Sequence, residues 1–224
     1  MRARAKAITP LAIVIGILSF LWTEFSLNFT FHWVANDLPA AAGVDQPKNF
    51  HLILPTAFIA WGLFFAAGGD NAAFGKIFLA TVFGSVAALV TMPLAFKTAD
   101  FPDFWGIALW VGIFAFILVM ILIAGDWYYV AGTFPCFAAV FLWWIATGLD
   151  GWVPNGGGVG SGPASLAAPA TAGAGAFGGL ISTPWAWVWF DTWVTLVCGV
   201  VLGIISAKVA AVLTPKPKAA PEAA

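Results

Sequence analysis

The chain has 224 residues, of which 62% are hydrophobic and only 8% are charged. Soluble domains carry about 25% charged residues, so this composition excludes an ordinary soluble domain. Nine Lys and Arg against ten Asp and Glu give a formal net charge of −1, which excludes a basic surface for nucleic acid. We therefore expect the lipid bilayer to surround most of the chain.

Six apolar stretches are separated by charged residues or by Gly and Pro. A helix crosses the hydrocarbon core of a bilayer with about 20 apolar residues. The stretches are 8–28, 52–67, 74–96, 104–124, 128–147 and 190–213. Runs such as 107–123 are apolar on every side, which excludes the alternating pattern of a transmembrane barrel. The sequence predicts an all-α integral membrane protein with six transmembrane helices, in one domain over residues 1–214.

The positive charges predict how this domain is oriented. With the N-terminus in the cytoplasm, seven Lys and Arg lie on the inner side: Arg2, Arg4, Lys6, Lys76, Lys208, Lys216 and Lys218. Two lie on the outer side, Lys48 and Lys97. Cytoplasmic segments are enriched in Lys and Arg, so both termini are predicted to be cytoplasmic. Residues 22–25 (WTEF) do not form a signal-peptide cleavage site, and we expect the first stretch to remain as a helix.

Two predicted outer loops are long. Residues 29–51 carry both histidines, and residues 148–189 carry no Lys or Arg. Within the second loop, residues 154–179 are a low-complexity Gly, Ala, Pro and Ser segment. Residues 215–224 (PKPKAAPEAA) are predicted to be a disordered cytoplasmic tail.

Glu24 is the one acidic residue that we expect inside a span. Asn28 and His32 follow at intervals of four, which places all three residues on one helix face if the helix continues. An ionisable side chain inside a membrane usually faces the interior of a bundle or a water-filled cavity. The three residues are therefore candidates for a polar vestibule or pore. The alternative is that Glu24 reaches the membrane interface and bonds to a neighbouring group.

No metal, cofactor or catalytic site is predicted. His32 and His51 lie near Glu24, Asp37 and Asp45 in sequence, but no HxxxH, HExxH or ExxH spacing joins them. Cys136 and Cys198 fall in separate predicted helices and no CxxC is present. The glycine run at 156–162 (GGGVGSG) follows no strand and lacks the Lys of a phosphate-binding loop.

Small residues mark two candidate helix-packing faces. Gly199 and Gly203 form a GxxxG pair in the last stretch, and Gly84 and Ala88 form a similar pair in the third. Small residues at this spacing let two helices approach closely. The pattern leaves open whether these faces pack within one chain or between chains.

Three segments resemble a known family of bacterial membrane proteins. They are 58–69 (FIAWGLFFAAGG), the Gly-containing helix that follows at 75–88, and 195–208 (TLVCGVVLGIISAK) as the closing span. With the order of six spans, they resemble the YcdZ-like bacterial inner-membrane proteins, a family of unknown function. The resemblance implies a topology and a location in the inner membrane but no activity and no site residues. The loops 29–51 and 148–189 depart from the family pattern as insertions.

The first functional hypothesis is a passive channel or facilitator for a small neutral or weakly charged solute. It rests on the six spans, on Glu24, and on the helix breaks at Pro55, Pro93 and Pro135. The alternative is a structural or accessory subunit of a larger membrane complex, with residues 148–189 as a docking element. The expected partners are the bilayer and either a second copy or another membrane subunit. An intramembrane enzyme is disfavoured because such enzymes gather several polar side chains from different helices.

Overall fold

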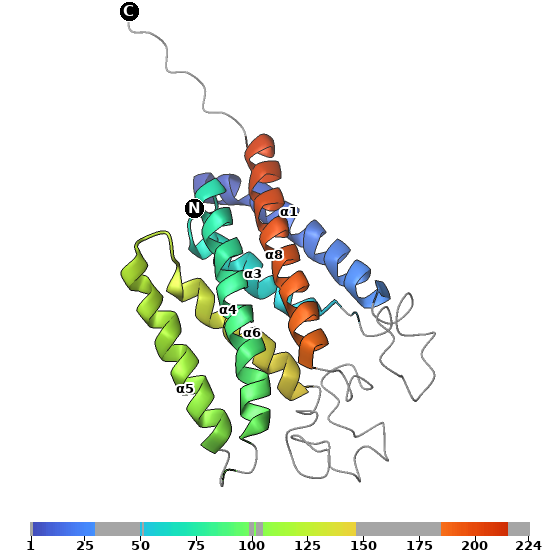
Figure 1. The fold of residues 1–224 in the computed structure, drawn as a ribbon. Coiled ribbons are helices and arrows are strands. Elements are labelled where there is room, and N and C mark those ends of the chain that lie inside the picture. The colour runs from blue at the N-terminus through green and yellow to red at the C-terminus, as the bar shows by residue number, and fades with distance from the viewer. Residues whose placement is uncertain are drawn as a thin grey trace, which may run out of the picture.

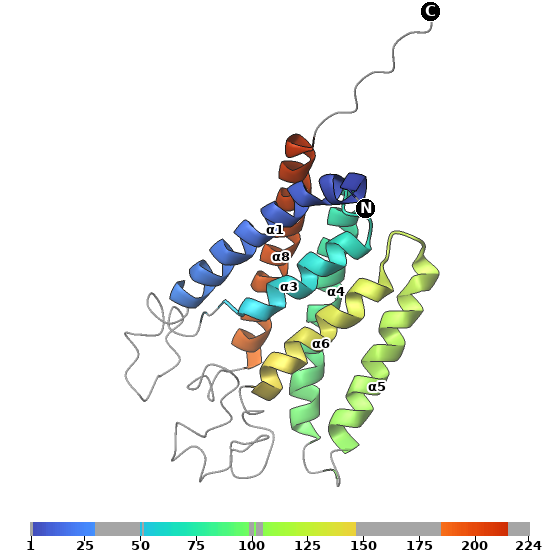
Figure 2. The same cartoon turned by 180° about the vertical axis from the view of Figure 1, so that it is seen from behind.

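The structure, a computed structural model, describes residues 2–29, 50, 52–98, 101, 105–146 and 185–214. The described part is helical, with six α-helices and one 3-10 turn (Figures 1 and 2). They are α1 (Arg2–Asn28), α3 (Leu54–Ala66), α4 (Asn71–Lys97), α5 (Trp105–Met120), η3 (Ile121–Ala124), α6 (Val130–Ala146) and α8 (Trp185–Leu213). The all-α part of the predicted fold class is confirmed.

Three of the helices are long and apolar enough to cross a membrane. The apolar segments are Ile8–Asn28 in α1, Asn71–Ala95 in α4 and Val188–Leu213 in α8. Each exceeds the length of about 20 residues that a bilayer core requires. The helices α3, α6 and most of the α5–η3 segment are also apolar but shorter.

Helix boundaries differ from the apolar stretches at several places, of which the fourth and the last stretch change the expected topology most. The fourth stretch is not one α-helix, because α5 ends at Met120 and the chain tightens into η3 before Gly125. The last helix begins at Trp185, so part of the predicted loop 148–189 belongs to α8. The Trp-rich residues 185–189, expected in the loop, form the first turns of this helix.

The helices form two crossing layers. In both views α1, α3 and α6 run parallel to one another, and they cross α8, α4 and α5 obliquely (Figures 1 and 2). Between the layers, α3 packs chiefly on α8, and α6 packs chiefly on α4. The two remaining helices are peripheral, since α1 contacts α8 and α3 while α5 contacts α4 and α6. The central helices are therefore α3, α4, α6 and α8.

Two glycine-containing turns reverse the chain at the same end of the bundle (Figure 1). After α3, Gly68 and Gly69 adopt φ values of 120° and 70°, which side chains with a Cβ rarely adopt. The Asp70 carboxylate then accepts a hydrogen bond of 2.7 Å from the Ala73 amide and caps α4. Before α6, Gly125 also has a φ of 120°. These residues explain why α3 and α4, and α5 and α6, are short-linked hairpins.

Close contacts at glycine hold the layers together. A Cβ atom on Gly199 would overlap the Ala57 carbonyl oxygen and lie 2.8 Å from the carbonyl carbon. One turn on, a Cβ on Gly203 would lie 2.7 Å from the Phe64 ring. Both glycines therefore pack on α3 of the same chain. Such contacts replace lipid with close backbone packing, which drives helix association in membranes.

The second small-residue face, on α4, packs against α6. A Cβ on Gly84 would lie 2.7 Å from the Phe137 amide nitrogen and 2.8 Å from the Cys136 Cβ. Ala88, one turn further along α4, is fully buried in a core cluster that includes Val140 and Val188. Within the described residues, both small-residue faces thus serve contacts inside one chain.

Replacing Gly199 with alanine should destabilise the bundle, because the added methyl group collides with the α3 backbone. Overpacking of this kind costs about 1–3 kcal/mol. The free energy of unfolding is measured by titration with sodium dodecyl sulfate in mixed micelles. Gly62→Ala on α3 is the matched control, since a Cβ there meets nothing within 4 Å. Equal stabilities of the two variants would contradict the assigned contact.

Candidate functional site

The structure brings together two of the three residues predicted to form a vestibule. Glu24 is exposed and Asn28 is half-buried, both in the last two turns of α1. The Asn28 Nδ2 donates to Glu24 Oε1 at 2.7 Å and to the Glu24 carbonyl oxygen at 2.8 Å. His32 lies outside the described residues, as do His51, Asp37 and Asp45. The Glu24 carboxylate is therefore held along α1 by its neighbour on the same face.

A second acid lies inside the helical bundle, and the expectation that Glu24 is the only one is wrong. Asp191 belongs to α8 and has 0% of its surface exposed. It lies within the apolar segment Val188–Leu213. The signal was visible, because Asp191 is the second residue of the predicted span 190–213. Buried ionisable groups in membrane helices are costly and mark functional positions.

Three polar contacts position α3 within the bundle. The Thr195 hydroxyl on α8 accepts a hydrogen bond of 3.1 Å from the Ile53 amide, just before α3, and donates to the Asp191 carbonyl oxygen. Near the other end of α3, the Trp61 indole donates to the Ser206 hydroxyl at 3.0 Å. From α1, the Trp22 indole donates to the Leu54 carbonyl oxygen at 3.1 Å.

Buried hydroxyl groups extend through the four central helices. We call this set the hydroxyl seam. Its members, each 0–2% exposed, are Thr56, Thr81, Ser85, Thr91, Thr133, Thr192, Thr195 and Ser206. Most donate to a carbonyl oxygen three or four residues earlier in their own helix. This back-bonding uses the hydroxyl proton and leaves oxygen lone pairs that accept hydrogen bonds.

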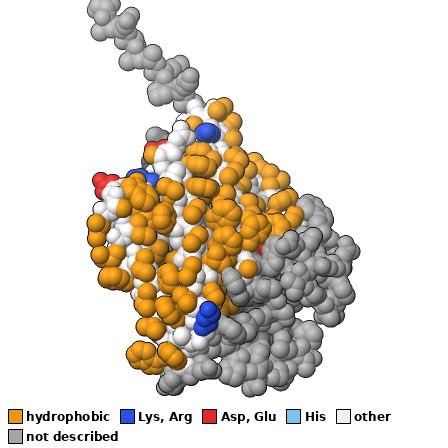
Figure 3. Space-filling view, in the orientation of Figure 1, with side chains coloured by type: hydrophobic (Ala, Val, Ile, Leu, Met, Phe, Trp, Pro, Cys, Tyr) orange, Lys and Arg blue, Asp and Glu red, His pale blue; other side chains and the backbone are white. Residues whose placement is uncertain are grey.

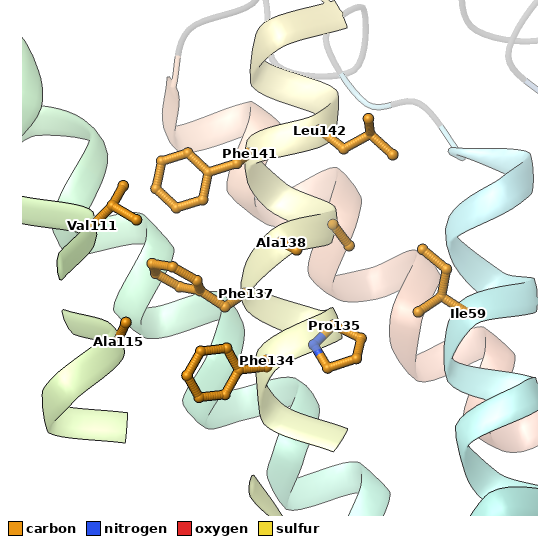
Figure 4. A pocket seen from close by; sticks show the side chains of 10 residues that line it. Ile59, Val111, Ala115, Phe134, Pro135, Phe137, Ala138, Phe141 and Leu142 are labelled. Atoms are coloured by element: carbon orange, nitrogen blue, oxygen red, sulfur yellow. The ribbon is translucent and has the colours of Figure 1, made fainter. Parts of the chain in front are cut away.

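An apolar groove runs along the outer side of α6. It has a volume of about 750 Å³ and takes Ile59 from α3 and Val111 and Ala115 from α5. Figure 4 shows Phe134, Phe137, Phe141 and other α6 side chains along its length. The remaining lining residues are Pro135, Ala138, Ala139 and Leu142. The lining side chains are all hydrocarbon, so the groove suits an apolar occupant.

Within the described ranges, no three His, Cys, Asp or Glu side chains gather as metal ligands would. Cys136 is buried in α6, and Cys198 is half-buried in α8. No family model, no curated protein and no solved structure matches the chain. The resemblance to the YcdZ-like proteins stays a prediction.

Thr195→Val should destabilise the protein more than Thr192→Val. Both threonines are fully buried in α8 and donate to a carbonyl four residues earlier, but only Thr195 also accepts the Ile53 amide. A buried amide left without its acceptor costs about 1–3 kcal/mol. Sodium dodecyl sulfate titration of the two isosteric variants measures the difference. If Thr192→Val is equally destabilising, the bond to Ile53 does not hold α3.

Proposed function

We propose that this protein is a passive channel or facilitator for a small neutral or weakly charged solute in the bacterial inner membrane. In this proposal all six α-helices span the bilayer, with η3 completing the fourth span, and both termini are cytoplasmic. The hydroxyl seam together with Asp191 carries the proposal. Such a set of polar side chains, placed among the four central helices, offers hydrogen-bond partners where lipid offers none.

The chemistry of the seam favours a solute that donates hydrogen bonds. The hydroxyl oxygens accept from O–H or N–H groups and so replace part of the water that a solute loses on entry. The Asp191 carboxyl group, when ionised, repels anions in a surrounding of low dielectric constant. The preferred solutes are therefore small alcohols and amides, which are uncharged and donate hydrogen bonds.

Passage requires a change from the described conformation, because the seam residues are packed with almost no exposed surface. Proline residues inside α4 and α6 supply places for such a change. Pro93 and Pro135 each lack an amide proton and remove a hydrogen bond from the helix interior. Kinks at these positions would separate the outer parts of α4 and α6, which pack on one another.

Asp191→Asn should change the rate of solute entry into proteoliposomes at least several-fold, because it replaces a buried ionisable carboxyl group with an amide at nearly constant volume. Stopped-flow light scattering with glycerol, urea and ammonia measures the flux. Asp126→Asn is the matched control, since Asp126 is exposed in the turn before α6. An unaltered rate for a solute that the wild type conducts would remove Asp191 from the pathway. Glu24→Gln tests the predicted vestibule by the same assay.

The apolar groove favours a second function, that of an accessory subunit in a larger membrane complex. A carbon-lined groove on the side of the bundle fits an apolar helix of another subunit. Native mass spectrometry of the complex from its own host identifies such a subunit. Ala138→Phe, which fills the groove, should then remove the subunit, whereas Ala108→Phe, an exposed position on α5, should retain it. A complex unchanged by Ala138→Phe would exclude the groove as its docking site.

A further inference from the structure

One face of α1 is apolar, exposed, and ends in an acidic residue. Ile13, Ile17 and Phe20 are 53%, 56% and 69% exposed, and Glu24 is exposed one turn further on. Within the chain, α1 contacts α8 and α3 through its other side. We call these four residues the α1 face, and no helix among the described residues covers it.

A face of α4 has matching properties but ends in a basic residue. Val86 and Val90 are 42% and 41% exposed, and Lys97 is exposed at the C-terminal end of the helix. Pro93 is half-buried between them. We call these four residues the α4 face. Figure 3 shows that hydrophobic side chains cover most of the described surface in this view, with few charged groups among them.

The two faces share the same spacing. Steps of four, three and four residues separate Ile13, Ile17, Phe20 and Glu24, and the same steps separate Val86, Val90, Pro93 and Lys97. At about 3.6 residues per turn, each set lies within an arc of about 60°. Alternating steps of three and four are typical of helices in left-handed packing, both parallel and antiparallel. In register, Glu24 falls beside Lys97.

The directions of the helices allow this contact. α1 and α4 both begin near the upper end of the bundle; α4 runs to the lower end, whereas α1 descends obliquely and ends higher (Figure 1). A neighbouring copy with the same orientation in the membrane therefore presents its α4 parallel in sense to this α1. Among the described residues, Asn28 donates to one carboxylate oxygen of Glu24, which leaves the second oxygen for the Lys97 ammonium.

We propose that the protein associates with copies of itself through the α1 face of one copy and the α4 face of the next, with a Glu24–Lys97 ion pair between them. Each copy contributes a different face to its two neighbours, so the contact is heterologous and forms a ring when its rotation closes. The apolar residues replace lipid along the helices, and the ion pair fixes their register. The inference does not depend on the transport proposal.

Charge reversal tests the pair. The oligomeric state of the purified chain in lipid nanodiscs is measured by native mass spectrometry and, across dilutions, by single-molecule photobleaching. Glu24→Lys and Lys97→Glu should each weaken association at least about tenfold, because like charges then face one another. The double variant should restore it. Lys208→Glu, an exposed position on α8, should leave association unchanged.

Cysteine cross-linking tests the same contact without altering its charges. Two differently tagged chains are co-expressed, one with Ile17→Cys and the other with Val90→Cys, both with Cys136 and Cys198 replaced by alanine. A cross-linked dimer should form from this pair but not from Ile17→Cys with Ile205→Cys, which places the second thiol on α8. A monomeric wild type, a double reversal that fails to restore association, or cross-linking through α8 instead would overturn the proposal.

Discussion

The architecture depends on the close approach of α3 and α8 at Gly199. Because α8 has no side chain there, its backbone reaches the backbone of α3 at Ala57. That approach brings the Thr195 hydroxyl to the start of α3 and the Ser206 hydroxyl to the Trp61 indole. Without the glycine, α3 would have to move outward and both bonds would lengthen. Backbone contact and polar contacts therefore stabilise the same interface.

The equivalent contact in the other half of the bundle is built differently. Gly84 lets α4 approach the backbone of α6 near Thr133 and Phe137, and the neighbouring interior is filled by aromatic and aliphatic side chains. Trp144 and Phe137 belong to this core, which also includes Met92 from α4 and Val188 from α8. One interface thus combines small residues with interhelical hydrogen bonds, whereas the other combines them with bulky apolar side chains. Both were marked in the sequence by paired small residues.

The sequence was sufficient to predict the helices but not their roles. Apolar stretches located the six described α-helices, because a long apolar run has few other solutions than a helix. They did not distinguish α1 and α5, which are peripheral, from α4, which is central, because lipid-facing and buried helix surfaces are equally apolar. The helix-packing glycines could be predicted from spacing alone, but their partners Ala57 and Phe64 could not, since pairing is a tertiary property.

The candidate site shows the same division. Glu24 and Asn28 were predicted from their interval on one helix, and the structure gives them a direct hydrogen bond. Asp191 was missed because a single acid does not interrupt an apolar stretch as long as 190–213. The hydroxyl seam was not predicted, since isolated Ser and Thr residues in four separate helices carry no local pattern. Only their common burial identifies them as a set.

The length of α3 has a consequence for the membrane itself. A helix of 13 residues extends only about 20 Å, roughly 10 Å less than the hydrocarbon core of a typical bilayer. Its bonds to Trp22, Thr195 and Ser206 limit its freedom to slide along α8. If α3 spans, the lipids on its exposed side must adapt through hydrophobic mismatch, by local thinning of the bilayer. The protein would then be most stable among lipids with short acyl chains. A thicker membrane would increase the mismatch at α3, the helix that these polar contacts hold in place.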